Sequence, residues 1–387
     1  MLSKEELIRR VEEAHNIRRW YQKMPYGIDW PVKTHFEDGK TNEKSFGEGR
    51  WKNYIWPILR RNEDDWKNST FCDVGCSAGL FLLRAWYDFG FKRLLGIEAA
   101  DGGYAQLQVT KEHFDKMPLV TYKNALGALT ETIADSKAPQ INMTTFPIVD
   151  VTMMSCVHYH MDINYLKRYL RTLAKKSLYF LLLTDEKAGG PTNASSTFFE
   201  RNIIGKDWTL WNNIYTPSIW LSDNPHNSTP WAPCKNITSL FYKSKLLKRL
   251  PVDECYKRQM NWHKGKGGLH EGWQKYAEVF YNEVFPQFID LVLEGKINEN
   301  NHRNCLVYDW QAKGLYNSTP WPPKVASERT LSYINIVKTV KDHGQEQPIA
   351  LQEHLDMADP WDGWHRVAVL KHLGFKYVYG IDVIPEK

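Results

Sequence analysis

Short apolar runs and one amphipathic stretch follow each other between residues 70 and 100. Residues 70–75 form an apolar run that ends in glycine, residues 80–90 repeat apolar side chains at helical spacing, and residues 93–100 form a second apolar run. Short apolar runs bounded by glycine predict buried strands, and a spacing near 3.6 residues predicts a helix that stops at Gly90. The order strand, turn, helix, strand opens a doubly wound α/β sheet.

The same pattern continues between residues 149 and 184. Residues 149–155 predict a buried strand, and residues 177–184 are almost wholly apolar, as is typical of parallel strands that are covered on both faces. Residues 163–176 between them predict a helix with one apolar face and lysines at its C-terminal end, where they suit the helix dipole. The expected fold class is therefore α/β with a Rossmann-like sheet. The apolar face consists of Leu166, Tyr169, Leu170 and Leu173.

The region after residue 185 is rich in tryptophan and poor in periodicity. Residues 186–197 predict a loop by composition, and the pentapeptide NSTPW occurs at 227–231 and again at 317–321. One interpretation is a recurrent turn that buries a tryptophan; the other is an acceptor pocket lined by aromatic rings. Residues 273–297 predict a helix that is interrupted at Pro286. The tryptophans that would line the pocket are Trp208, Trp211, Trp220 and Trp231.

The C-terminal segment again shows regular patterns of apolar positions, unlike the tryptophan-rich region before it. Residues 327–343 predict a helix that stops at Gly344, with a strand beginning at Pro348. Residues 362–383 predict a glycine turn, a helix running to Gly374 and a further strand, which together make a small α+β module. The expected divisions of the chain are a helical lead-in at 1–45, an α/β domain at 46–197, an aromatic-rich substrate or linker region at 198–312, and the α+β domain at 313–387.

The composition of the chain bears on its compartment, on nucleic-acid binding and on membrane spans. The chain has 387 residues, a net charge of +5 and six cysteines, and none of the cysteines forms a CxxC pair. The mild positive charge is spread along the chain and does not indicate nucleic acid, while the cysteine pattern predicts a reducing, cytoplasmic compartment. No run of 18 uncharged apolar residues exists, so no membrane span is expected.

The turn at residues 75–79 carries the first candidate chemistry. A dinucleotide fingerprint needs glycine at its middle position so that the backbone can approach a pyrophosphate, and here that position is Ser77. Glu98 ends the second strand 19 residues after Gly79, and an acid at that place binds a ribose diol. A ribose site without a pyrophosphate cradle points to S-adenosylmethionine.

These residues resemble a known family. Asp73-x-Gly75-x-x-x-Gly79 followed by Gly96-Ile97-Glu98 resembles motifs I and II of class I S-adenosylmethionine-dependent methyltransferases. The flanking GRWKNYIWPIL and YAQLQV resemble the subgroup that includes the tRNA wobble-uridine carboxymethyltransferase, and the match covers roughly residues 45–185. The resemblance implies S-adenosylmethionine as cofactor, held by Asp73, Gly75, Cys76, Ser77, Gly79, Glu98 and Asn124.

Two histidines follow the strand predicted at 149–155. His158 and His160 lie two residues apart, so an extended segment points both side chains the same way, and either could remove the proton of a hydroxyl acceptor. The alternative is that one caps a turn and the other is hydrogen-bonded in the core. The position lacks the [D/N/S]PP[Y/F/W] motif of DNA amino-methylating enzymes, and the His263-x6-His270-Glu271 spacing is not a standard zinc pattern, so no metal is expected.

The module at 313–387 resembles the ParB/sulfiredoxin-like fold. The resemblance rests on HGQEQPI, on the DGWHR turn at 362–366 and on LGFKYV. In that superfamily the turn binds a nucleotide or a protein phosphate, and free amides at a helix N-terminus beside a guanidinium have the chemistry for it. The resemblance implies a nucleotide or phosphate site, and the alternative is a purely structural module. The site residues would be Asp362, Gly363, His365 and Arg366.

The leading functional hypothesis is S-adenosylmethionine-dependent O-methylation of a polar acceptor such as a sugar or glycan. One alternative is RNA modification on tRNA, which the short basic patches do not favour. A second is a bifunctional enzyme whose C-terminal domain phosphorylates while the first domain methylates. A third is a binding module in which the ParB-like part docks a nucleotide or DNA.

Overall fold

The computed structural model describes residues 2–18, 20, 48–62, 65–123, 146–155, 157, 163–185, 207–217, 236–265, 277–314, 320–352 and 359–383. The chain divides into two compact units, which are treated separately: residues 1–143 with 149–245, and residues 144–148 with 246–387. This division differs from the expected domain boundaries, because residues 198–245 group with the first unit and residues 246–312 group with the second.

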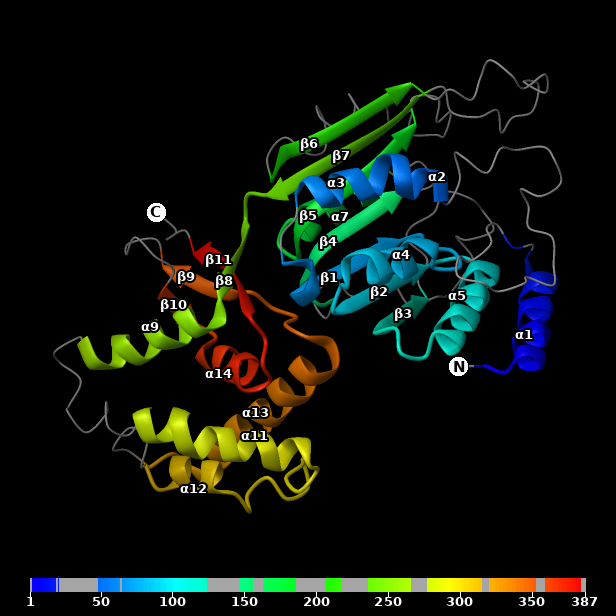
Figure 1. Ribbon diagram of the computed structural model, residues 1–387. Coiled ribbons are helices and arrows are strands. Elements are labelled where there is room, and N and C mark those ends of the chain that lie inside the picture. The colour runs from blue at the N-terminus through cyan, green and yellow to red at the C-terminus, as the bar shows by residue number, and fades with distance from the viewer. Residues whose placement is uncertain are drawn as a thin grey trace, which may run out of the picture. The chain divides into compact units, whose positions relative to one another are not determined.

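A seven-stranded sheet forms the centre of the first unit (Figure 1). Its strand order is β3-β2-β1-β4-β5-β7-β6. The first five strands of this order run parallel to one another, and β7 is antiparallel to both β5 and β6. The α/β class predicted from the sequence is confirmed. The strand order reverses between β1 and β4, and ligands of open α/β sheets bind outside the carboxyl ends of the strands at such a switch point. The strands are β1 Thr70–Val74, β2 Arg93–Glu98, β3 Leu119–Lys123, β4 Val149–Ser155, β5 Ser177–Asp185, β6 Trp208–Pro217 and β7 Asn236–Ser244.

The helices of this unit follow the predicted apolar faces. The predicted helix α4 ends at Gly90, which adopts φ +69° as a helix C-terminus requires, and all four residues of the face predicted for α7 are buried. Helix α1 begins with the backbone amide of Glu6 donating to the Ser3 hydroxyl, 3.2 Å away. In Figure 1, α3 and α4 lie over the face of the sheet turned to the viewer. The helices are α1 Lys4–Ile17, α2 Glu48–Arg50, the π-helix η2 Trp51–Ile55, α3 Trp56–Arg61, the 3₁₀ turn η3 Trp66–Asn68, α4 Leu80–Phe89, α5 Asp101–His113 and α7 Ile163–Leu173.

The second unit has a four-stranded sheet in the order β10-β9-β11-β8. Strand β11 runs parallel to β9 and antiparallel to β8, which comes from the region expected to be a linker. Residues 144–148 belong to this unit, where the Ile148 amide donates to the Gln345 carbonyl at 2.7 Å. The elements are β8 Leu247–Pro251, α9 Val252–Gly265, η7 Phe280–Val284, α11 Phe285–Leu293, α12 Leu306–Ala312, α13 Pro323–His343, β9 Ile349–Gln352, β10 Asp359–Asp362, α14 Trp364–His372 and β11 Tyr377–Val383.

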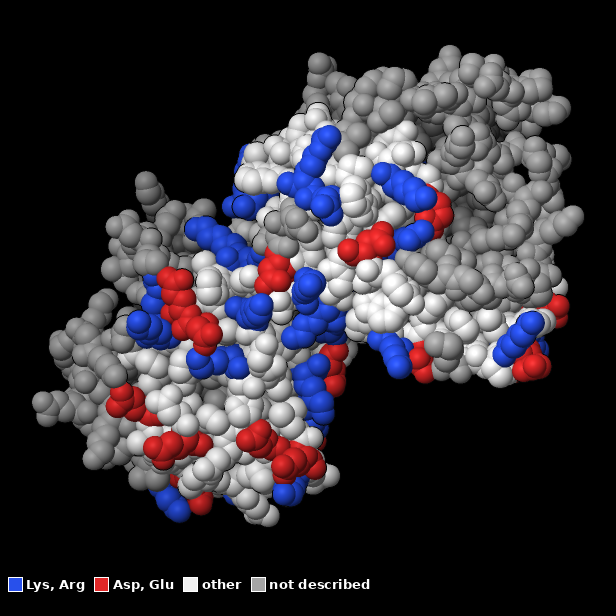
Figure 2. Space-filling model, viewed as in Figure 1, with Lys and Arg blue, Asp and Glu red and all other residues white. Residues whose placement is uncertain are grey.

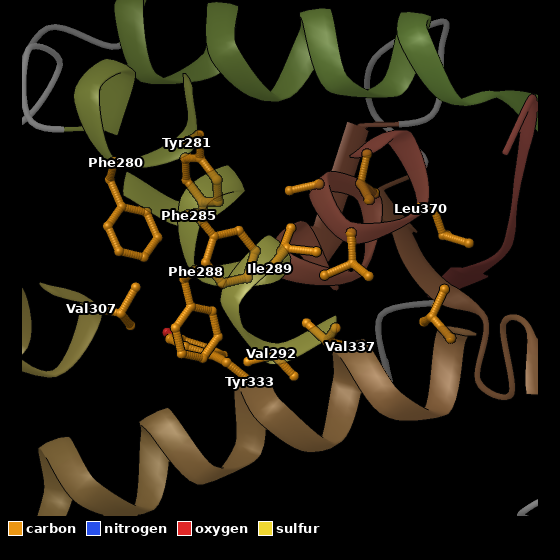
Figure 3. Close-up of a cluster of buried hydrophobic side chains, with 14 of the residues drawn as sticks. Phe280, Tyr281, Phe285, Phe288, Ile289, Val292, Val307, Tyr333, Val337 and Leu370 are labelled. Atoms are coloured by element: carbon orange, nitrogen blue, oxygen red, sulfur yellow. The ribbon is translucent and has the colours of Figure 1, made fainter. Parts of the chain in front are cut away.

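An aromatic cluster fills the core of the second unit (Figure 3). Phe280, Phe285 and Phe288 project from η7 and α11 toward Tyr333 of α13. The predicted interruption of the helix at Pro286 is present as the π-helical turn η7, which ends two residues before the proline. A proline lacks the amide that would continue the α-helical ladder, so the turn that precedes it rearranges. No helix among the described residues is long and apolar enough to cross a membrane.

Candidate functional site

The carboxyl ends of β1, β2 and β4 meet at one level of the sheet. Val74 of β1 pairs with Ile97 of β2 and with Met154 of β4. The next residue of each strand therefore lies in one row across the edge. This row consists of Glu98, Gly75 and Ser155, so the first glycine of the turn lies between a carboxylate and a hydroxyl.

The turn that follows β1 depends on its glycines. Gly75 has φ +76° and Gly79 has φ +87°, and Ser77 between them has φ +48°. A Cβ on Gly75 would lie 2.5 Å from a methyl carbon of Val157, so only glycine fits there. The turn leads the chain into α4, which begins at Leu80 directly after Gly79.

Glu98 is fixed against this turn. Its two carboxylate oxygens accept hydrogen bonds from the backbone amides of Ser77 at 2.7 Å and Ala100 at 2.9 Å. The side chain is only 8% exposed, and a Cβ on Gly103 of α5 would lie 2.9 Å from the carboxylate carbon. A carboxylate has about four lone-pair sites, so both oxygens retain acceptor capacity for a further ligand.

Asp73 is a buried acid without a hydrogen-bond partner on one of its oxygens. The side chain is 1% exposed, and its Oδ2 atom has no donor. Burial raises the pKa of the Asp73 carboxyl well above its ordinary value, and the Glu98 carboxylate adds to the rise. Buried acceptors in proteins are nearly always paired, so this oxygen fits a donor that a ligand supplies.

Cys76 and Gly79 serve the packing of the turn. A Cβ on Gly96 would lie 3.2 Å from the Cys76 sulfur. Burial raises the pKa of the Cys76 thiol well above its ordinary value. A Cβ on Gly79 would lie 2.8 Å from Leu107 of α5. Both cysteines near the turn, Cys72 and Cys76, are buried as the sequence predicts. Any contact from Cys76 to a ligand would therefore use its backbone.

The structure brings six of the predicted cofactor residues to this one edge. Asp73 ends up in β1, Glu98 at the end of β2, and the others in the turn between β1 and α4. Asn124, His158 and His160 lie outside the described residues. Trp208, named as a pocket residue in one interpretation, is buried at 2% exposure and its indole nitrogen donates to the Leu170 carbonyl, so it packs in the core.

Arg50 is a residue at this edge that sequence reasoning missed. It ends α2, it is 8% exposed, and its Nη1 atom donates to the Ser155 hydroxyl at 3.4 Å. In the sequence, this segment is marked only by the resemblance of GRWKNYIWPIL to a methyltransferase subgroup. A pairing across 105 residues leaves no mark on local periodicity, so no pattern in the sequence could have revealed it.

The turn before α14 in the second unit holds the other candidate site. Gly363 has φ +100°, and a Cβ there would lie 2.5 Å from a methyl carbon of Ile349. The Arg366 Nη1 atom donates to the carbonyls of Gln347 at 2.9 Å and Pro348 at 3.0 Å. This guanidinium therefore ties α14 to the segment that leads into β9.

His365 is surrounded by aromatic rings. Its ring stacks on Tyr333 with centroids 4.2 Å apart, and its Nε2 atom lies 3.3 Å from the Tyr281 hydroxyl. Burial lowers the pKa of His365 to about 3, and the charges of Arg329 and Arg366 add to the shift. The imidazole is neutral at ordinary pH. The side chain of Asp362 lies outside the described residues.

Charged side chains of both signs are interspersed on the face of the molecule that Figure 2 shows. On the face in Figure 2, Lys and Arg side chains alternate with Asp and Glu in small groups. Nucleic-acid interfaces are typically marked by a continuous basic surface. Among the described residues no group of three or more His, Cys, Asp or Glu side chains could hold a metal ion.

No protein-family model matches the chain, and no curated protein matches it either. Solved structures with a similar arrangement include a SAM-dependent methyltransferase from Aquifex aeolicus, at 11% identity and a TM-score of 0.35 over 52% of this chain and 95% of that one. TehB from Haemophilus influenzae is similar at 11% identity and a TM-score of 0.35, over 51% of this chain and 67% of that one. The bifunctional kinase-methyltransferase WbdD is similar at 14% identity and a TM-score of 0.38, over 62% of this chain and 46% of that one.

Proposed function

We propose that the first unit is an S-adenosylmethionine-dependent methyltransferase that binds its cofactor at the carboxyl edge of β1 and β2. The observation that carries the proposal is the pairing of two acids with a glycine turn. Glu98 is held by the Ser77 and Ala100 amides beside the turn, and Asp73 presents a buried oxygen without a donor. Glu98 suits the ribose of a cationic nucleoside ligand, and Asp73 suits an ammonium group at its other end.

The residues fit S-adenosylmethionine better than a dinucleotide. The Ser77 amide would face a pyrophosphate in a dinucleotide site, but here it donates to Glu98. Two carboxyl groups at the edge would also repel phosphates. In contrast, Glu98 can accept from a ribose diol, and the free oxygen of Asp73 can accept from an ammonium group. The glycines allow the ligand to lie against the backbone of the turn.

The acceptor is proposed to be the hydroxyl of a polar molecule such as a sugar or glycan. Bound S-adenosylmethionine supplies a methyl group that its sulfonium already activates. The protein has to orient the acceptor and remove its proton. His158 and His160 are the proposed bases, since they follow β4 by three and five residues and ligands bind beyond the carboxyl ends of such strands.

The test is transfer of an isotopically labelled methyl group from S-adenosylmethionine to a panel of saccharides and to tRNA, detected by mass spectrometry. A saccharide should gain the label. Alanine at whichever of His158 and His160 is the base should lower turnover by about 10²–10⁴ while cofactor affinity stays unchanged. Label on tRNA alone would contradict the proposed acceptor, and near-normal turnover in both variants would contradict the proposed base.

A further inference from the structure

We infer that Ser327 and His302 form a nucleophile–base pair that hydrolyses small esters with an apolar acyl group. Both residues belong to the second unit, so this activity is separate from methyl transfer in the first. The inference rests on the hydrogen bonds of the two side chains, on the loop that holds the histidine and on the helix that carries the serine.

The hydrogen bonds of His302 fix its tautomer. Its Nδ1 atom lies 2.8 Å from the Glu299 carbonyl oxygen, and its Nε2 atom lies 2.5 Å from the Ser327 hydroxyl. A carbonyl oxygen can only accept, so Nδ1 carries the proton of the neutral imidazole and Nε2 is left as an acceptor. The Ser327 hydroxyl therefore donates to Nε2, which is the arrangement in which an imidazole activates a nucleophilic serine.

The Ser327 hydroxyl does not follow the common pattern of hydroxyl side chains in helices. Such side chains often donate to the carbonyl one turn earlier, as Thr330 of α13 does to the Ala326 carbonyl at 2.8 Å. Ser327 instead donates to a side chain 25 positions away in the sequence. The serine is 7% exposed and the histidine is half-buried, so the pair is shielded from bulk water and still accessible from the surface.

The loop before α12 holds the histidine in place. The Asn301 side chain donates to the carbonyl five residues earlier at 2.8 Å, and the Cys305 thiol donates to the His302 carbonyl at 3.1 Å. The Lys338 ammonium of α13 binds the Glu299 carboxylate at 2.6 Å. The helix that carries the serine therefore also anchors the residue whose carbonyl orients the imidazole, and such preorganisation is what a reactive pair requires.

The reaction is ester hydrolysis in two steps. The Ser327 oxygen bonds to the ester carbonyl carbon while its proton passes to Nε2 of His302, and the alcohol leaves with that proton. Water then attacks the acyl-serine, and its proton passes through the same nitrogen to the serine oxygen as the carboxylic acid is released. The serine lies in the second turn of α13, so the positive end of the helix dipole favours the negative charge that develops on the ester oxygen.

Exposed apolar side chains on the same two segments indicate the substrate class. Among the described residues of the second unit, the exposed large apolar side chains are Leu306 and Val325. Leu306 directly follows the loop that holds the histidine, and Val325 lies in the first turn of α13, two residues before the serine. An apolar acyl chain would remove such surface from water, so an ester of this kind is the expected substrate.

An alkyl fluorophosphonate tests the pair, because it bonds to an activated serine oxygen with loss of fluoride. Mass spectrometry of the digested 387-residue chain should place the label on Ser327, and the chain should hydrolyse p-nitrophenyl butyrate. His302→Gln keeps an acceptor for the hydroxyl but removes the base, so labelling and hydrolysis should both slow by about 10²–10⁴-fold. Ser327→Ala should abolish both. Ser332→Ala, which changes an exposed serine of the same helix, is the matched control and should react like the wild type.

The absence of label on Ser327 in the wild-type chain would overturn the inference. Labelling at an unchanged rate in His302→Gln would overturn the role of the histidine, and hydrolysis that persists in Ser327→Ala would overturn the role of the serine. The melting temperature of each variant shows whether it folds. If neither variant folds, labelling of Ser327 and ester hydrolysis by the wild-type chain decide the question by the first criterion.

Discussion

At the scale of single residues, Asp73 is the most informative group in the first unit. A carboxyl that is buried, lacks a donor on one oxygen and lies near a second carboxylate is unfavourable when charged. The arrangement adds nothing to the stability of the folded protein, whereas a ligand ammonium would donate to the free oxygen and favour the charged form of the carboxyl. A buried carboxyl with a raised pKa close to the end of a strand is typical of a binding site.

The raised pKa of Asp73 predicts the pH dependence of cofactor binding. An ammonium pairs with the ionised carboxylate, so affinity for S-adenosylhomocysteine should rise with pH through the raised pKa and be lost as pH falls below it. In the ligand-free protein the sign is opposite, because a raised pKa contributes stability at low pH that is lost as pH rises through it. Calorimetry across a pH series would measure the effect. In Asp73→Asn the affinity should be weaker and this pH step absent, and an identical step in that variant would assign the titration to another group.

At the scale of elements, the local patterns in the sequence were sufficient for the parts of the site that lie close together in the chain. The strand, the glycine turn, α4 and Glu98 are predictable because each depends on spacing within about 30 residues. Arg50 and Ser155 were not predictable, since their pairing joins residues 105 positions apart. The compact units also differ from the boundary expected near residue 198, because β7, far along the chain, pairs with β5 over seven residues.

Two glycines of the second unit give a matched test of the turn before α14. Gly363 and Gly295 both have positive φ, but only Gly363 has a neighbour, Ile349, in the space that a Cβ would fill. Gly295→Ala should cost about 1 kcal/mol of stability for the left-handed conformation alone. Gly363→Ala should cost a further ~1–3 kcal/mol for the clash. Denaturant unfolding of the full chain, with hydrogen exchange to locate the change in β9 and α14, would measure both, and equal costs would contradict the account of Gly363.

At the scale of the whole molecule, the chain carries two compact units with separate candidate sites. Among the described residues, only the first unit presents a buried acid, Asp73, with an oxygen that lacks a donor beside a glycine turn. In the second, Arg366 is committed to the Gln347 and Pro348 carbonyls and His365 is enclosed by rings. The likeness to ParB/sulfiredoxin-like proteins, and with it a phosphate site at residues 362–366, stays a prediction of the sequence.

A panel of nucleotides and phosphate esters with magnesium tests that prediction. A ligand should raise the melting temperature of the wild-type protein by binding at the N-terminus of α14, and Arg366→Ala should reduce the shift. Because the pKa of His365 is lowered to about 3, the shift should not follow the ordinary titration of histidine. The melting temperature of ligand-free Arg366→Ala serves as the control for lost structure. The absence of any shift in the wild-type protein would make the second unit a structural or docking module.

Calorimetric titration of S-adenosylhomocysteine into the 387-residue chain tests the central claim most directly. The wild-type protein should bind one equivalent, Glu98→Gln should weaken binding by about 1–3 kcal/mol because the ribose diol loses a charged acceptor, and the exposed-acid control Glu12→Gln should bind normally. No binding to the wild-type protein, or equal binding to the wild type and Glu98→Gln, would contradict the assignment of this edge as the cofactor site.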